Sequence, residues 1–91
     1  MTHAVVLIGA SRAALPNLGG RLADVEGVAE AYSVTGEYDF VAMLRVRSPE
    51  EVADVVTHRF ADLKGIRNTQ TMIAFETFSQ HDLEALFSIG S

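Results

Sequence analysis

Hydrophobic and polar positions along the chain indicate four strands. The first, Ala4 to Ile8, is a continuous apolar run rich in β-branched residues. Uninterrupted apolar character is typical of a strand covered on both faces, which predicts a central place in a sheet. Further strands are predicted over Val28 to Val34, Phe40 to Val46 and Ile66 to Phe78.

Two helices are predicted between these strands. From Ala13 to Val25, apolar residues recur at steps of three and four, which places them on one helical face. Pro16 then falls in the first turn, where its missing N–H costs nothing. The second helix begins at Ser48 as N-cap, with Glu51 three residues later to complete a capping box, and it extends to a glycine at position 65.

The order of elements is βαββαβ, followed by a predicted tail helix from about residue 79 that carries its apolar residues between Asp82 and Phe87. Right-handed crossovers place both helices on the same side of a four-stranded antiparallel sheet with strand order 4-1-3-2. This is an α+β, ferredoxin-like arrangement. A chain of 91 residues fits a single domain, so we expect residues 1–91 to form one unit.

Such an arrangement leaves one face of the sheet without a helix. Hydrophobic residues make up 48% of the chain, and the two central strands are apolar on both sides. An exposed apolar face of this size predicts a partner, most simply a second copy that packs sheet against sheet. The pattern therefore predicts a homo-oligomer before any family is considered.

Charge and composition narrow the functional classes. The net charge is −5, and the seven Lys and Arg residues are scattered rather than clustered, so we expect no direct contact with nucleic acid. The chain has no cysteine, which excludes disulfides and thiolate chemistry. It shows no signal peptide and no apolar run near the roughly 20 residues of a membrane span, so we expect a soluble, cytoplasmic protein without membrane contact.

The joint between the second and third predicted strands, Gly36-Glu37-Tyr38-Asp39, holds more chemistry than a hairpin requires. Gly36 suits a turn with positive φ and a close backbone approach. A free amino acid carries an ammonium, which suits a carboxylate such as Asp39, and a carboxylate, which suits glycine N–H groups or threonine hydroxyls. The turn is therefore a candidate effector site, although Asp39 accepting local N–H bonds is an equally weighted alternative.

Two motifs carry a family resemblance. The stretch VTGEYDFVAMLRV, followed by a helix and then by GIRNTQTMIAF, resembles the effector-binding domain of the leucine-responsive regulatory protein and asparagine synthase regulator (Lrp/AsnC) family. That family has a Gly-x-x-Asp turn, here Gly36 to Asp39, and a Val/Ile-x-x-Thr-x-Thr segment, here Ile66 to Thr71. The resemblance covers roughly residues 4 to 78. Because the chain begins at the first strand, it resembles the stand-alone form (RAM domain) that lacks the helix-turn-helix domain.

The resemblance implies how such a domain assembles and what it binds. It implies dimers whose sheets face each other in an α/β barrel, and dimers that assemble further into octamers or decamers. Amino acids are expected at contacts between dimers, near the Gly-x-x-Asp turn. A full-length Lrp/AsnC regulator is a possible partner through which the domain modulates transcription or metabolism. The resemblance implies no cofactor, and any contact with DNA would come from that partner.

The candidate ligand-binding residues have different expected roles. Asp39 is expected to meet the ligand ammonium, the backbone at Gly36 to approach the ligand, and Tyr38 to wall the pocket or to lie at an interface. Threonine and serine hydroxyls are polar lining, unless the threonines serve only strand formation. The full set is Ser33, Gly36, Tyr38, Asp39, Thr69 and Thr71.

Two other functions remain open. The domain could be an assembly adaptor without a ligand, in which the turn only joins dimers. It could also be a small dimeric-barrel enzyme in which a buried His58 pairs with Asp39 as acid and base. We expect no catalytic site, because His3, His58 and His81 are far apart in sequence, and their spacing also predicts no metal site.

Overall fold

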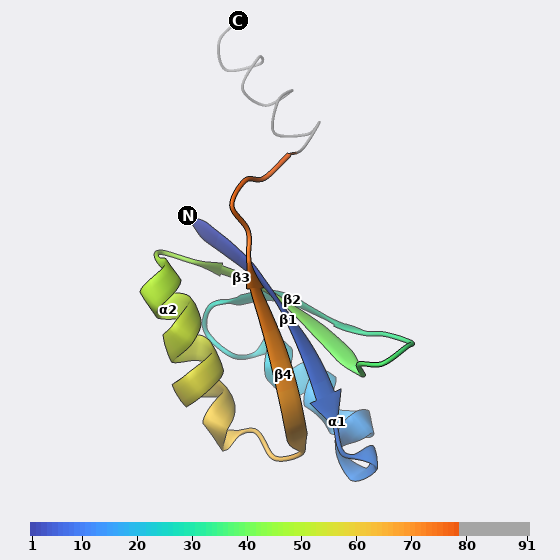
Figure 1. Ribbon diagram of the computed structural model, residues 1–91. Helices are drawn as coiled ribbons and strands as arrows, with labels where there is room; N and C mark the ends of the chain where they lie inside the picture. Colours follow the sequence, from blue (N-terminus) through green and yellow to red (C-terminus); the bar gives the residue numbers. More distant parts are fainter. Residues whose placement is uncertain (79–91) are drawn as a thin grey trace, which may run out of the picture.

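Four strands form one antiparallel sheet in the computed structural model, which describes residues 1–78. The strands are β1 (Thr2–Ala10), β2 (Val28–Ser33), β3 (Phe40–Val46) and β4 (Ile66–Ile73), in the order β2-β3-β1-β4. The predicted order and the ferredoxin-like fold are confirmed (Figure 1). The tail helix predicted from about residue 79 lies outside the described residues.

Both predicted helical segments pack on the same face of the sheet. The first begins with the short 3₁₀ turn η1 (Arg12–Ala14) and continues as α1 (Leu15–Ala23). The second begins as α2 (Pro49–Asp54) and continues through a π-type turn, η2 (Val55–Arg59), and a 3₁₀ turn, η3 (Phe60–Asp62). Helix positions are therefore as predicted, but the second helix is not regular.

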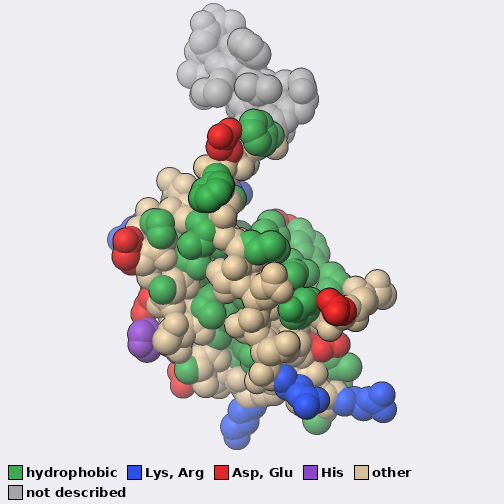
Figure 2. All heavy atoms as spheres, viewed as in Figure 1, with side chains coloured by type: hydrophobic (Ala, Val, Ile, Leu, Met, Phe, Trp, Pro, Cys, Tyr) green, Lys and Arg blue, Asp and Glu red, His purple; other side chains and the backbone are tan. Residues whose placement is uncertain are grey.

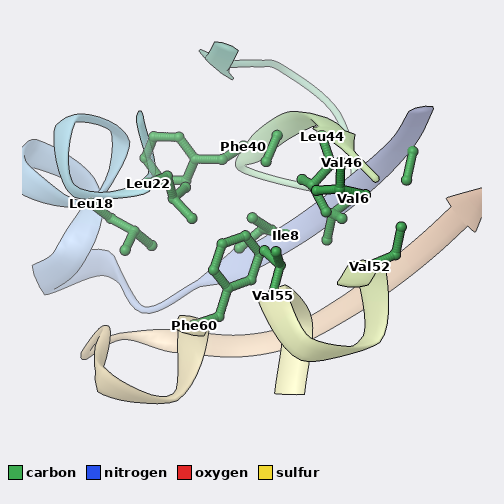
Figure 3. Packing of buried hydrophobic residues seen from close by; sticks show 12 residues of the cluster. Val6, Ile8, Leu18, Leu22, Phe40, Leu44, Val46, Val52, Val55 and Phe60 are labelled. Carbon is green, nitrogen blue, oxygen red and sulfur yellow. The ribbon is translucent and has the colours of Figure 1, made fainter. Parts of the chain in front are cut away.

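The hydrophobic core lies between the sheet and this helical layer (Figure 3). Alternate residues of β1, namely Ala4, Val6 and Ile8, are buried, as the period of two in a strand requires. The glycine at position 19 lets α1 approach the sheet, because a Cβ there would come within 3.1 Å of the Phe40 ring. The other large buried side chains are Leu18, Leu22, Leu44, Val46, Val52, Val55 and Phe60.

The last strand is shorter than predicted. We expected it to reach Phe78, but β4 ends at Ile73. Ile73 pairs with Ala4, and the Ala74 N–H then donates to the His3 carbonyl oxygen at 2.9 Å. Since β1 begins at Thr2, there is almost no further backbone for β4 to pair with. Strand propensity alone therefore overestimated the length of β4.

Helix α2 begins with the predicted capping interaction. The Ser48 hydroxyl accepts a hydrogen bond from the Glu51 N–H at 3.2 Å. The Glu51 carboxylate accepts one from the Arg47 N–H at 2.8 Å, one residue earlier than the reciprocal bond of a standard capping box. This hydrogen bond lowers the pKa of the Glu51 carboxyl from its ordinary value of 4.5, and the Arg59 guanidinium adds to the effect.

The lowered pKa of Glu51 predicts a pH dependence of stability. Because the folded state binds this proton less tightly than the unfolded chain, the contribution is fully present above pH 4.5 and is lost as the pH falls through the folded-state pKa. We expect the melting temperature of the wild type to fall more steeply than that of Glu51→Gln as the pH decreases from 6 to 3. Parallel melting curves for the two proteins would contradict this role.

The described residues contain neither a membrane-spanning helix nor a metal-binding cluster. Within residues 1–78, no helix is long and apolar enough to cross a membrane. Over the same part of the chain, no group of three or more His, Cys, Asp or Glu side chains is placed to hold a metal ion.

Candidate functional site

The loop between β2 and β3 is anchored against the end of β1. The Val34 N–H donates to the Asp39 carbonyl oxygen at 3.0 Å, which closes the loop. The Asp39 N–H donates to the Ile8 carbonyl oxygen at 2.9 Å. Gly36, at the exposed tip, has a φ of 110°, so the predicted positive φ is confirmed. The Gly-x-x-Asp turn therefore has an exposed tip and a base held by the central strand.

Asp39 has a defined structural contact. Its Oδ2 atom accepts a hydrogen bond from the Ala10 N–H at 2.8 Å. The side chain is half-buried, and a carboxylate has lone pairs for further donors. Asp39 was expected either to meet a ligand or to accept N–H bonds of its own turn, but the donor that its side chain meets lies on β1. This contact also fixes where the negative charge lies.

A polar hollow opens beside this carboxylate. It encloses about 420 Å³ between the loop, the end of β1 and the start of β4. We call it the Asp39 hollow. Its lining comprises Gly9, Ala10, Glu37, Asp39, Arg67 and Asn68.

An irregularity in the pairing of β1 with β4 brings Arg67 and Asn68 into the hollow. Gly9 pairs with Asn68, but the next residue, Ala10, pairs with Ile66, which leaves Arg67 as an extra residue in β4. A bulge of this kind redirects a side chain next to a site. The Asn68 side chain also lies directly over Gly9, where a Cβ would overlap the Asn68 Oδ1 atom.

The charges of the hollow suit a small zwitterion. Asp39 and Glu37 present carboxylates, which favour an ammonium group, while Arg67 presents a guanidinium, which favours a carboxylate. Among the described residues, Arg67 forms no ion pair, so its donors are available to a ligand. Lys and Arg side chains gather at the end of the molecule where β4 begins (Figure 2). Sequence reasoning assigned the carboxylate-binding role to hydroxyls and glycine N–H groups and did not identify Arg67.

Tyr38 does not line the Asp39 hollow, because its side chain extends across the sheet. Its hydroxyl donates to the Gln70 Oε1 atom on β4 at 2.9 Å. Gln70 pairs with Leu7, whose side chain points away from the helices because its neighbours Val6 and Ile8 are buried beneath them. Tyr38 therefore reaches over β1 on the face of the sheet that carries no helix.

The predicted hydroxyl residues are not brought to the hollow within one chain. Thr69 pairs with Ile8, and Thr71 pairs with Val6, so both point toward the helical layer. Thr69 lines a depression beside Phe60, and Thr71 lines a groove beside α2. Ser33 is exposed at the end of β2, paired with Phe40. Their part in ligand binding stays a prediction.

The open face of the sheet is apolar along its centre. Val5 pairs with Met43 on one side and Met72 on the other, and Leu7 pairs with Val41. These side chains are only partly covered within one chain. At the β2 edge, the Tyr32 hydroxyl donates to Glu30 at 2.6 Å, which raises the pKa of the tyrosine. The open sheet face consists of Val5, Leu7, Tyr32, Val41, Met43 and Met72.

The geometry required by the enzyme alternative is absent from residues 1–78. His58 lies on the helix surface with 75% of its side chain exposed. Its Nδ1 atom is 3.0 Å from Asp54 Oδ1, one turn earlier on the same helical segment, rather than near Asp39. An exposed histidine paired with a neighbouring surface carboxylate explains its position without catalysis. The buried His58–Asp39 pair was therefore a wrong hypothesis.

Comparison with protein families matches most of the chain. Residues 3–83 match the family described as the Lrp/AsnC ligand binding domain. Among curated proteins, an uncharacterized HTH-type transcriptional regulator of Pyrococcus furiosus, PF0250, is 33% identical over 60 residues. That match covers 66% of this chain and 40% of PF0250, so the chain corresponds to less than half the length of this relative.

Solved structures share the fold. TTHA0845 from Thermus thermophilus has a TM-score of 0.81 and 41% identity, and the match covers 88% of this chain and 100% of that chain. The transcriptional regulator NMB0573 from Neisseria meningitidis, solved as an L-Met complex, has a TM-score of 0.76, with 87% of this chain and 53% of that one covered. Its 12% identity shows the fold alone.

Proposed function

Because the chain belongs to the Lrp/AsnC ligand-binding domain family, we propose that it senses a free amino acid as a small effector bound in the Asp39 hollow. The family is regulatory and generally non-catalytic. The observation that carries the proposal is the placement of opposite charges around one hollow at the Gly-x-x-Asp turn, with carboxylates on the loop and Arg67 on β4.

The chemistry of an amino acid fits this placement. Asp39, held by the Ala10 N–H, is expected to accept the ligand ammonium, because its position is fixed before the ligand arrives. Arg67 is expected to receive the ligand carboxylate through paired N–H donors. The exposed backbone at Gly36 can approach a ligand or a neighbouring molecule, since nothing lies within 4 Å of the place where a Cβ would stand.

Assembly is the second part of the proposal. The open sheet face is expected to pack on the same face of a second copy, since removal of apolar surface from water is the main favourable contribution to most protein association. Dimers are expected to assemble into octamers or decamers. The Asp39 hollow is open in one chain, so a neighbouring dimer is expected to supply its remaining walls, including the groups that select a side chain.

The names of two similar proteins support a regulatory role. PF0250 carries the name of a transcriptional regulator, and the NMB0573 structure, which has the same fold, holds L-methionine. We propose that the present domain modulates transcription or metabolism through a partner such as a full-length Lrp/AsnC regulator. An amino-acid effector would then change the assembly that the partner joins.

The test is a binding screen with each of the twenty amino acids at millimolar concentration. A ligand that binds only the folded protein at 100 times its Kd adds about 2.7 kcal/mol of stability. We expect at least one amino acid to raise the melting temperature or to shift the mass measured by light scattering. If the whole panel changes neither quantity, the adaptor function without a ligand replaces the sensor function.

Asp39→Asn is the variant that assigns the site. It keeps an oxygen that can accept the Ala10 N–H and removes the charge that would pair with the ligand ammonium. Loss of one charge-assisted hydrogen bond is expected to weaken amino-acid binding by about 10- to 100-fold. Isothermal titration calorimetry measures the change.

A matched substitution controls for the loss of charge. Asp24→Asn removes the same charge at an exposed position outside the Asp39 hollow. The Kd of this variant for the amino acid is therefore expected to equal that of the wild type. Equal affinities for Asp39→Asn and Asp24→Asn would place the ligand elsewhere.

A further inference from the structure

The segment that follows β4 exposes two phenylalanine side chains. We call residues 74–78 the arm. Phe75 is 102% exposed and Phe78 is 86% exposed, whereas no other large hydrophobic side chain between residues 2 and 78 is more than half exposed. Figure 1 shows the arm leaving the body beyond β4, and Figure 2 shows hydrophobic side chains projecting from it. Large exposed apolar groups of this kind mark interaction sites.

An apolar groove lies open between α2 and β4. It holds about 300 Å³ of space, and its walls include Pro49, Val52, Ala53, Val56, Thr71 and Ile73. An apolar cavity of roughly 150 Å³ is large enough to hold benzene, so the groove has room for a phenylalanine ring. Thr71, which the sequence indicated as ligand lining, is explained here as part of a groove wall.

The path of the chain directs the arm away from its own groove. Ile73 ends β4 and lines the groove, and the next residue, Ala74, donates its N–H to the His3 carbonyl oxygen on β1. This bond keeps the start of the arm in line with the sheet. Phe75 then lies beyond the strand and touches almost nothing among residues 1–78.

Within the part of the chain that the structure describes, one molecule therefore presents both an open apolar groove and an exposed aromatic arm. If each copy docks its arm in the groove of the other copy, the two contacts are identical and are related by a two-fold axis. Burying the phenylalanine side chains of two exchanged arms removes apolar surface from water, which favours association. Each copy carries both the groove and the arm, so two identical copies can form this contact.

We propose that the arm of one chain docks in the groove between α2 and β4 of a second copy, with Phe75 as the anchoring side chain. This contact lies on the helix side of β4 and differs from the open sheet face. It does not rest on amino-acid binding. The second copy contributes the aromatic group that completes the groove, and the groove completes the burial of the arm.

Disulfide trapping tests the contact, because the native chain contains no cysteine. Glu76→Cys, which keeps the Phe75 anchor, and Ala53→Cys are prepared as separate chains of different size, refolded together and oxidised under mild conditions. Both positions are exposed, so neither change is expected to alter the fold, which circular dichroism checks. We expect a mixed disulfide dimer on a non-reducing gel. Docked cysteines react at an effective concentration on the order of millimolar, so at micromolar protein the mixed disulfide is expected to form about 1,000-fold faster than between undocked chains.

Ala29→Cys is the matched control. Ala29 is exposed on β2, at the opposite edge of the sheet from β4, so its pairing with Glu76→Cys is expected to stay at the undocked rate. Equal rates for Ala29→Cys and Ala53→Cys overturn the proposal. The double variant Glu76→Cys/Ala53→Cys distinguishes the remaining case, since an internal disulfide in a single chain would show that the arm folds onto its own groove and would also overturn the exchange.

Discussion

Replacing Leu7 with lysine is expected to convert the proposed dimer into monomers while the fold is retained. Leu7 lies at the centre of β1 on the open sheet face, beside Val41, and only part of it is covered within one chain. Packing a second sheet on this face would bury the introduced ammonium without a partner. An uncompensated buried charge costs about 3 to 5 kcal/mol, which raises the dissociation constant by about a hundred- to several-thousand-fold.

Leu15→Lys is the control for this substitution. Leu15 is a leucine at the start of α1, 42% exposed, and it lies on the helix side of the sheet rather than on the open face. Sedimentation equilibrium is expected to show monomers for Leu7→Lys and the wild-type mass for Leu15→Lys, with equal helix content by circular dichroism. A folded Leu7→Lys protein that keeps the wild-type mass would show that the open face is not the dimer contact.

Replacing Gly65 with alanine is expected to destabilise the protein by about 3 kcal/mol, because backbone strain at positive φ and overpacking each cost about 1 to 3 kcal/mol. Gly65 joins η3 to β4 with a φ of 99°. Its carbonyl oxygen accepts a hydrogen bond from the Ser11 N–H at 2.8 Å, which ties this joint to the end of β1. A Cβ at this position would overlap the Ala14 Cβ atom, so steric strain adds to the backbone strain.

Two further variants separate these causes. Gly36→Ala has a similar positive φ but open space around the added methyl group, so it is expected to show the backbone strain alone. Ala14→Gly combined with Gly65→Ala removes the overlapping atom and is expected to recover the packing part of the loss in a double-mutant cycle. Urea denaturation measures the free energies of unfolding. A loss in Gly65→Ala no larger than that in Gly36→Ala would rule out the contact with Ala14.

The predicted core follows from local periodicity. The steps of three and four along α1 place Leu18 and Leu22 on the face that meets the sheet, whereas the continuous apolar run of β1 did not indicate that Val6 and Ile8 are the residues that face the helices. Helix α2 starts at the predicted Ser48 cap because the capping groups are adjacent in sequence. The irregular turns η2 and η3 were not predicted, since they depend on how Val55 and Phe60 pack against the sheet.

The end of β4 shows a limit of propensity. Residues 74–78 include side chains that favour strands, yet a strand also requires a partner backbone. The position at which β1 begins sets that partner, and it is more than 60 residues away in the sequence. Because β4 ends at Ile73, Phe75, which was expected to lie in the strand, is part of the exposed arm.

The candidate site also contains residues that the sequence identified and residues that it did not. Gly36 and Asp39 stood out in the sequence because the turn is local, and the positive φ at Gly36 is a backbone requirement of that turn. Arg67 did not stand out, because its entry into the Asp39 hollow depends on the bulge between β1 and β4. The pairing of β4 with β1 also turns Thr69 and Thr71 toward the helices, since residues directly opposite each other share a face.

By itself, the sequence determined the elements, their order, the buried face of each helix and the turn that carries Asp39, because all of these arise from spacings of a few residues and from the handedness of connections. Only the tertiary structure decided where β4 ends, that Arg67 shares a hollow with Asp39, and that His58 lies on the surface. These features depend on strand register and on packing between distant segments, and a shift of one residue in register reverses the face of every side chain in a strand.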